Sequence, residues 1–125
     1  MSKQAELLVV KHPAVADRLA RLRDVATPTP VFRKLLEELG MFLAYEATRD
    51  LPLVMQPVQT PLQTTQAERI GTLPMVAPLL RTGLGLMPGF LNVIDHAVVA
   101  HLGFYRDPQT LEAVEYYFKT PEDIA

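Results

Sequence analysis

The chain has 125 residues and a mass of 14.0 kDa, so it can form one domain with a core but hardly two. It has no cysteine and a single serine near the start, which excludes disulfides, thiolate catalysis and cysteine-bound zinc and disfavours a serine nucleophile. The net charge of −2 gives no reason to expect nucleic-acid binding. Because there is neither a secretory signal nor an apolar run near the roughly 20 residues of a membrane span, we expect a soluble, cytoplasmic protein with no membrane partner.

An amphipathic helix is the first element that the sequence predicts. Val15, Leu19 and Leu22 recur at helical spacing, and charged residues occupy the other faces. The helix should open near His12 and close before Thr27.

A second helix is predicted from Thr29 to about Thr48, with Thr29 as its N-cap and Pro30 as its first helical residue. Its later half, residues 41–47, is apolar on most faces and should be deeply buried. On its exposed face we expect two i, i+4 ion pairs, which join Arg33 to Glu37 and Lys34 to Glu38.

Residues 54–60 alternate between apolar and polar side chains, and prolines interrupt the pattern at 57 and 61. Alternation with prolines is typical of an edge strand or a protruding hairpin. Residues 56–68 could be a solvated arm or a surface that pairs with another subunit, and the solvated arm is the commoner outcome.

The second half of the sequence predicts a βαβ unit. Residues 73–80 suit a strand buried on both faces, although Pro74 and Pro78 each lack a ladder donor. A glycine-containing turn at 81–85, an apolar helix over 84–94 and a second buried strand over 98–105 follow. Residues 106–108 predict a turn, and residues 114–119 predict a further strand.

Both strands of this unit run into an arginine, Arg81 and Arg106. Ligands of open parallel sheets bind beyond the carboxyl ends of the strands, so both guanidinium groups could face one anionic ligand. Gly83 and Gly85 would let backbone N–H groups approach phosphate oxygens. The alternative is a tight turn with solvated arginines, and the spacing matches neither a dinucleotide-binding glycine motif nor a Walker A loop.

The remaining polar residues favour structural roles. The three histidines, at positions 12, 96 and 101, lack the spacing of a helical metal site. Glu46, Arg49 and Asp50 lie at the end of the second helix. We interpret them as a structural ion cluster, with support of a neighbouring site as the alternative.

Several segments resemble the amino-terminal part of the uracil phosphoribosyltransferase family, in the family's order and along nearly the whole chain. The most specific are Tyr-Glu-Ala-Thr-Arg-Asp at 45–50 and Leu-Arg-Thr-Gly-Leu-Gly at 80–85. Further matches are Val-Lys-His-Pro at 10–13, Phe-Arg at 32–33, His-Leu-Gly-Phe-Tyr-Arg-Asp-Pro at 101–108 and Thr-Leu-Glu-Ala-Val-Glu-Tyr-Tyr at 110–117.

The resemblance implies an α/β fold of the type I phosphoribosyltransferase class, with a parallel sheet, flanking helices, amino-terminal helices and a β-arm. Residues 1–125 would form a single domain that is the amino-terminal portion of such a fold. The implied reaction converts uracil and 5-phosphoribosyl 1-pyrophosphate to UMP and pyrophosphate in pyrimidine salvage, with Mg²⁺ bound alongside the diphosphate. A homodimer is also implied.

The resemblance implies that Arg81 and Arg106 bind the phosphoribosyl pyrophosphate, together with Thr82 and Gly83 of the first loop. Thr82 stands where the family usually has alanine, which a threonine hydroxyl should tolerate. No catalytic nucleophile and no metal-ligating residue of the chain is implied.

Two segments of the family are absent from this sequence: the phosphoribosyl-binding loop and the glycine-rich segment that holds uracil. We therefore expect a truncated form of a longer fold. The alternative function is a catalytically incompetent fragment that acts only as a dimerising interaction module.

Overall fold

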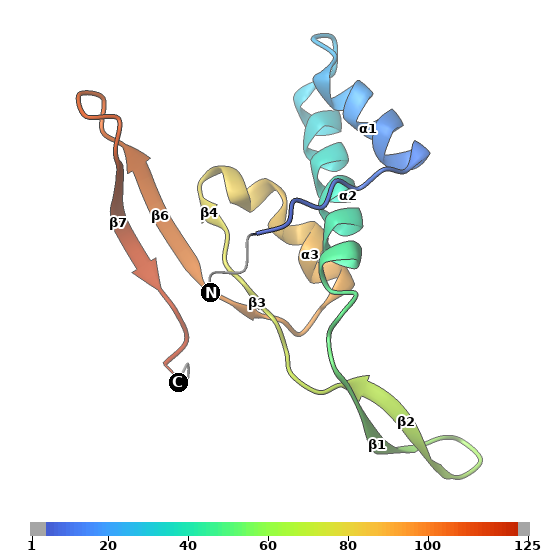
Figure 1. The fold of residues 1–125 in the computed structure, drawn as a ribbon. Helices are drawn as coiled ribbons and strands as arrows, with labels where there is room; N and C mark the ends of the chain where they lie inside the picture. Colours follow the sequence, from blue (N-terminus) through green and yellow to red (C-terminus); the bar gives the residue numbers. More distant parts are fainter. Residues whose placement is uncertain (1–4, 123–125) are drawn as a thin grey trace.

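The computed structural model describes residues 5–122, in which the helices lie together, with one pair of long strands to the left of them and a hairpin below them (Figure 1). The α-helices are α1 (Pro13–Arg23), α2 (Thr29–Ala47) and α3 (Met87–Val93), and η1 (Thr82–Gly85) is a 3₁₀ turn. The strands are β1 (Leu53–Gln59), β2 (Thr64–Ile70), β3 (Met75–Val76), β4 (Leu79–Leu80), β5 (Val98–Val99), β6 (His101–Arg106) and β7 (Ala113–Lys119). Within residues 5–122, no helix is both long and apolar enough to cross a membrane.

Helices α1 and α2 begin and end close to their predicted bounds. His12 is the N-cap of α1, since its Nδ1 accepts a hydrogen bond from the Ala14 backbone N–H at 3.0 Å. For α2 the N-cap is Pro28 rather than Thr29, and no side chain caps it. Arg18 joins the two helices, because its Nε lies 2.7 Å from the Glu38 carboxylate and its guanidinium stacks over the Phe42 ring.

That contact explains why one predicted ion pair is wrong: Glu38 reaches across to Arg18, not along its own helix to Lys34. The other is also wrong, since Glu37 accepts a hydrogen bond from Asn92 of α3 at 2.9 Å and the ion pairs described for residues 5–122 do not include Arg33. Contacts between helices took precedence over contacts along one helix.

The core lies where α2 meets α3, and it is small. Leu35, Leu39, Ala44, Ile94 and Ala100 are its buried apolar residues. Glycines allow the close crossing of the helices: a Cβ at position 40 would lie 2.6 Å from the Leu86 carbonyl oxygen, and one at position 89 would lie 2.6 Å from the Met41 nitrogen.

The predicted deep burial of residues 41–47 is wrong for most of that segment. Ala44 is buried, but Met41 and Leu43 are exposed and Tyr45 is 65% exposed. Helix α2 packs on α1, α3 and η1, and these contacts leave Met41, Leu43 and Tyr45 exposed.

The βαβ unit is confirmed, with shorter elements than predicted. β3 pairs with β5 and β4 with β6, both in parallel, and β7 adds to β6 in antiparallel fashion. The predicted strand over 73–80 is divided into β3 and β4, because Pro78 has no N–H and interrupts the ladder. The predicted helix over 84–94 is likewise divided into η1 and α3.

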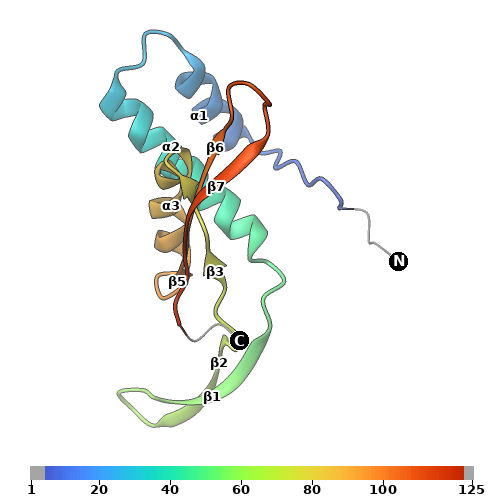
Figure 2. The same ribbon diagram turned by 90° about the vertical axis from the view of Figure 1, so that its left-hand side faces the viewer.

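Strands β1 and β2 form the predicted protruding hairpin. Their register runs from the Leu53–Ile70 pair to the Gln59–Thr64 pair, and their contacts are chiefly with one another. Figure 2 shows the hairpin extending away from the helices. Both faces of this arm are largely exposed.

The chain as a whole exposes far more surface than a compact monomer. Its accessible surface is 10284 Å². The scaling of accessible surface with mass gives about 6,700 Å² for a folded monomer of this mass. Because the excess includes large apolar side chains on the arm, on β3, β4 and β7 and on α2, the fold has apolar surface without cover.

Candidate functional site

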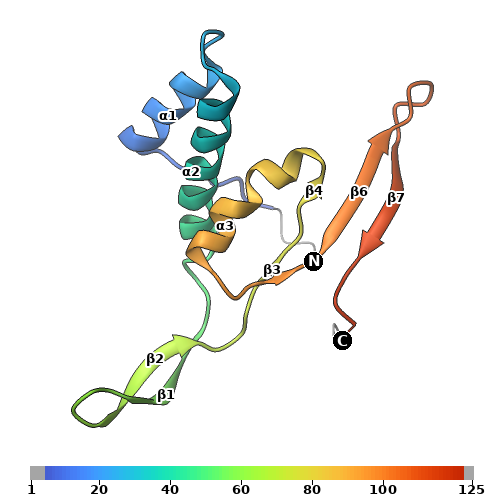
Figure 3. The same ribbon diagram turned by 180° about the vertical axis from the view of Figure 1, so that it is seen from behind.

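Arg81 directly follows β4 and Arg106 is the last residue of β6, and the carboxyl ends of these two parallel strands lie at the same end of the sheet. Leu79 pairs with Leu102 and Leu80 with Gly103, and Arg81 follows the last of these pairs. Arg106 comes three residues after Gly103 along β6. Figure 3 shows β4 beside β6, with β6 continuing past it. The register therefore places both arginines at the same end of the sheet, and their joint contact with one ligand stays a prediction.

Both arginines are exposed, and neither takes part in the ion pairs described for residues 5–122. By contrast, Arg18, Arg21 and Arg49 each bind a carboxylate of this chain. Two guanidinium groups without a carboxylate partner in the described chain can accept an anionic ligand at no loss of an ion pair.

A shallow depression of about 530 Å³ lies at this end of the sheet. Its lining residues are Leu80, Arg81, Thr82, Phe104, Tyr105 and Tyr116. The structure thus brings Arg81 and Thr82 together, while Gly83 and Arg106 are not among the lining residues. Arg106 is next to the lining residue Tyr105 in the sequence.

The aromatic lining is what the sequence interpretation missed. The Tyr105 and Tyr116 rings lie with their centroids 6.1 Å apart and their planes tilted by 42°. Gly103 makes room for Tyr116, since a Cβ there would come within 2.8 Å of the Tyr116 ring. The pairing of β6 with β7 brings Tyr116 here, and no local sequence signal announces it.

Thr82 and Gly83 open the 3₁₀ turn η1 that follows β4, and the Leu80–Arg81 peptide bond is cis. The first backbone N–H groups of such a turn have no acceptor within it, so they can serve a ligand. Packing also explains the glycines. A Cβ at position 83 would lie 3.0 Å from the Pro78 Cα, and one at position 85 would collide with Leu36.

Asp107 holds the loop that follows Arg106. Its Oδ1 accepts backbone hydrogen bonds from Gln109 at 2.7 Å and from Thr110 at 3.0 Å. These bonds favour the carboxylate form and hold the pKa of Asp107 below its ordinary value. The chain therefore leaves the sheet in a defined direction just after Arg106.

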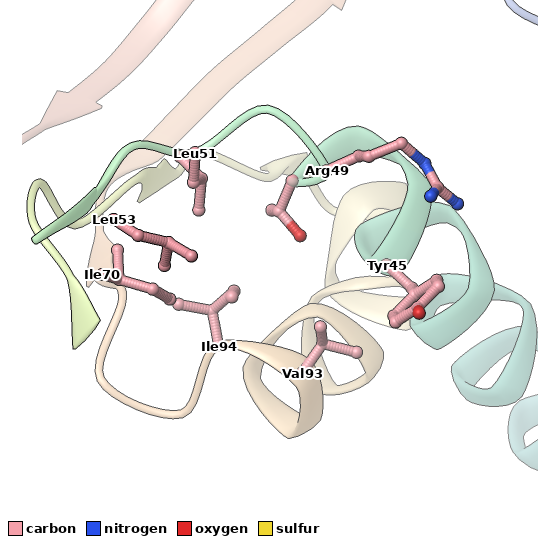
Figure 4. A pocket seen from close by; sticks show the side chains of 8 residues that line it. Tyr45, Arg49, Leu51, Leu53, Ile70, Val93 and Ile94 are labelled. Carbon is pink, nitrogen blue, oxygen red and sulfur yellow. The ribbon is translucent and has the colours of Figure 1, made fainter. Parts of the chain in front are cut away.

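A second pocket of about 370 Å³ lies where α2, the arm and the end of α3 meet (Figure 4). Apolar side chains of Leu51, Leu53, Ile70, Val93 and Ile94 surround most of it. The Arg49 guanidinium points away from the centre of the pocket in Figure 4 and binds Glu46 at 2.7 Å. That bond lowers the pKa of Glu46 and raises that of Arg49.

Within the predicted ion cluster, Glu46 and Arg49 are joined and Asp50 is not part of the pair. The structural role of this cluster stays a prediction. His96 has a structural partner as well, with its Nδ1 2.5 Å from the Asp95 carboxylate, a contact that lowers the pKa of Asp95. Among residues 5–122, no group of three or more histidine, aspartate or glutamate side chains could hold a metal ion.

Comparisons with known proteins agree with the resemblance seen in the sequence. The sequence model of the family described as uracil phosphoribosyltransferase matches residues 9–125. A curated uracil phosphoribosyltransferase of Caulobacter vibrioides is 49% identical over 122 residues, which is 97% of this chain. That of Staphylococcus epidermidis is 47% identical over 117 residues, or 93% of this chain.

A solved structure shares the fold. The structure of the AQ2163 protein from Aquifex aeolicus matches with a TM-score of 0.85 at 34% identity, over 92% of this chain and 56% of that chain. The curated relatives are also longer, since the match spans 58% of the Caulobacter protein and 56% of the Staphylococcus protein. The chain thus spans little more than half the length of the relatives it matches.

Proposed function

Because this chain belongs to the uracil phosphoribosyltransferase family, we propose that it supplies the diphosphate-binding end of an enzyme that makes UMP and pyrophosphate from uracil and 5-phosphoribosyl 1-pyrophosphate. The reaction is a pentosyl transfer, and its metabolic role is pyrimidine salvage. The observation that supports it is the pair of exposed arginines, Arg81 and Arg106, at the shared carboxyl end of β4 and β6.

The proposed chemistry is a substitution at the anomeric carbon of the ribose. The bond from that carbon to the pyrophosphate oxygen breaks, and its electron pair leaves with pyrophosphate. A uracil nitrogen forms the new bond and gives up its proton to solvent. The reaction needs no protein nucleophile, which agrees with the absence of cysteine. The protein must instead stabilise the leaving charge and position the two reactants.

In this proposal Arg81 and the Thr82–Gly83 backbone bind the diphosphate oxygens. Arg106 adds a second positive charge, and Tyr105 and Tyr116 form aromatic walls of the depression. Arginine suits the task because its planar fork binds phosphate in a bidentate manner and keeps its charge.

Magnesium is part of the proposal as an ion that arrives with the diphosphate and neutralises part of its charge. The residues lining the depression include no carboxylate, and the described chain has no metal-binding cluster. Residues 5–122 therefore offer no magnesium site of their own, and we assign no step to the ion. A homodimer and a cytoplasmic location, both expected from the sequence, stay predictions.

The test uses the 125-residue chain alone and the same chain followed by the carboxy-terminal segment of the Caulobacter relative. UMP is measured from uracil, phosphoribosyl pyrophosphate and Mg²⁺. In whichever form is active, we expect Arg106→Ala to lower turnover by about 10²–10³-fold, as the loss of a charge-stabilising group does elsewhere. Arg33→Ala, at an exposed arginine of α2, is the matched control and should leave turnover unchanged.

Normal UMP formation by Arg106→Ala would remove this residue from the site. Circular dichroism of the variant must match the parent, so that a lost fold is not taken for a lost charge. An intact mass of the natural protein would show whether further residues follow.

A second candidate function is an interaction module without catalysis. It is favoured by the apolar surface left exposed and by the match to little more than half of each relative. If neither form of the chain yields UMP while the 125-residue chain self-associates, this candidate replaces the first.

A further inference from the structure

Tyr116 lies at an irregularity in the pairing of β6 with β7. Tyr117 pairs with Gly103 of β6. Glu115 pairs with the next residue of β6, Phe104, so Tyr116 is left without a Cα partner there. One extra residue on one strand is a β-bulge, which re-aims a side chain relative to the alternation of a regular strand. The bulge therefore decides where the Tyr116 side chain lies.

The ring of Tyr116 extends over Gly103. A Cβ at position 103 would lie 2.8 Å from the ring atoms Cε2 and Cζ, and Cζ is the atom that carries the hydroxyl. On its other side Gly103 pairs with Leu80, the residue before Arg81. The hydroxyl end of Tyr116 therefore lies beside the point at which β4 runs into Arg81, and both side chains line the same depression.

The Tyr116 hydroxyl is available to a ligand. The residue is 55% exposed, and the side-chain hydrogen bonds described for residues 5–122 do not use its hydroxyl. Its ring has a neighbour in Tyr105, which restricts how the ring can turn. A phenol hydroxyl beside a guanidinium can donate to the anion that the guanidinium binds.

We propose that Tyr116 is a ligand-binding residue of the depression and that its hydroxyl donates a hydrogen bond to the diphosphate bound by Arg81. The identity of the anion rests on the proposed function. The acceptor oxygen is charged, so the bond is stronger than one between neutral groups. It holds the diphosphate before and during its departure, and such uniform binding lowers KM without a change in kcat.

The alternative is that Tyr116 only packs against Tyr105 and Gly103. The two roles differ in what the loss of one oxygen atom does. Tyr116→Phe keeps the ring and its neighbours and removes the hydroxyl alone. A packing role leaves the affinity for an anion unchanged in this variant, whereas a ligand-binding role lowers it.

The experiment uses the 125-residue chain and the same chain followed by the carboxy-terminal segment of the Caulobacter relative. Inorganic pyrophosphate is the probe for both in isothermal titration calorimetry. KM and kcat are measured in whichever form makes UMP. We expect Tyr116→Phe to weaken pyrophosphate binding about tenfold, as the loss of one hydrogen bond to a charged group does. The KM for phosphoribosyl pyrophosphate should rise by a similar factor, with kcat and the KM for uracil unchanged.

Tyr117→Phe is the matched control. Tyr117 is the next residue of β7 and is 43% exposed, but it does not line the depression. Its loss of a hydroxyl should therefore leave pyrophosphate binding and both KM values unchanged.

Gly103→Ala tests the placement of the ring. The added Cβ would displace the Tyr116 ring and should weaken pyrophosphate binding as Tyr116→Phe does. Because both changes act on one hydroxyl, the double variant should bind no more weakly than Tyr116→Phe alone. Tyr116→Phe adds no atom, so it decides the proposal by itself if Gly103→Ala loses the circular dichroism of the parent.

The outcomes separate this proposal from the proposed function. If Arg81→Ala abolishes pyrophosphate binding and Tyr116→Phe leaves it unchanged, the tyrosine contact is overturned and the proposed function stands. Weaker binding in Tyr116→Phe without UMP from either form would contradict the proposed function and leave the contact standing. If neither form binds pyrophosphate, both are contradicted.

Discussion

The helices of this molecule and its strands β3 and β4 differ in whether they satisfy their own backbone hydrogen bonds and cover their own apolar side chains. Helices α1, α2 and α3 satisfy their backbone groups internally and bury Leu35, Leu39 and Ala44 between them. The strands β3 and β4 depend on neighbours for both backbone pairing and cover, and residues 5–122 leave one of their edges unpaired and one of their faces exposed. A helix satisfies its backbone hydrogen bonds within its own segment, whereas a strand needs a neighbouring strand to satisfy them.

The largest expected effect concerns the chain as a whole. Even ~400 Å² of bare apolar sheet forgoes roughly 10 kcal/mol at ~25 cal/mol per Å², which rivals the stability of an entire domain. The isolated chain should therefore be marginally stable, bind a hydrophobic dye and aggregate unless association covers the sheet. Dye fluorescence and a thermal melt are the measurements. A cooperative, high-temperature melt of a monomer without dye binding would contradict the prediction.

Two leucine-to-alanine substitutions compare how much a helix residue and a strand residue contribute to the free energy of unfolding. Leu35 is 2% exposed on α2, and Leu35→Ala should lower the free energy of unfolding by about 2–5 kcal/mol. Leu79→Ala on β4 should change it by less than about 0.5 kcal/mol in the isolated chain. Urea denaturation followed by circular dichroism measures both. Equal losses would mean that the sheet face is covered in solution.

Deletion of residues 56–65 shortens the arm. Because Met55 pairs with Glu68, the remaining Gln66 and Ala67 can close a two-residue hairpin turn. The arm packs chiefly on itself, so the monomer should lose little stability while self-association weakens. Analytical ultracentrifugation compares the two chains, and unchanged sedimentation would count against the arm as a dimer element.

The smallest expected effect is a change with pH in the stability of the loop after β6. The folded pKa of Asp107 lies below its ordinary value of 3.8, so its carboxylate stabilises the loop above that pH. This contribution is lost as the pH falls through the folded pKa. The Gln109 and Thr110 amide shifts should follow that titration below about pH 4. Asp107→Asn should abolish the titration and Glu112→Gln should not, and an unaltered titration in Asp107→Asn would assign it to another group.

Much of the fold was predictable because its signals are local. The spacing of Val15, Leu19 and Leu22 predicted α1, and alternation with prolines predicted the hairpin of β1 and β2. The βαβ unit and the shared end of Arg81 and Arg106 followed from the order of short apolar runs. The aromatic lining from Tyr116 was not predictable, because it depends on the register of β7 against β6.

Periodicity and turn residues act within a few positions, so the order of helices, turns and strands could be predicted from the sequence. Which side chains and backbone groups contact one another depends on how these elements pack. Glu38 binds Arg18 of another helix, and Met41 lies in solvent although its neighbours are apolar. Pro74 and Pro78 looked like obstacles to an inner strand, yet their missing donors point to the paired side, which leaves the other edge free to pair. The side of a strand on which a residue's N–H falls depends on which neighbour it meets, and that is a long-range property of the fold.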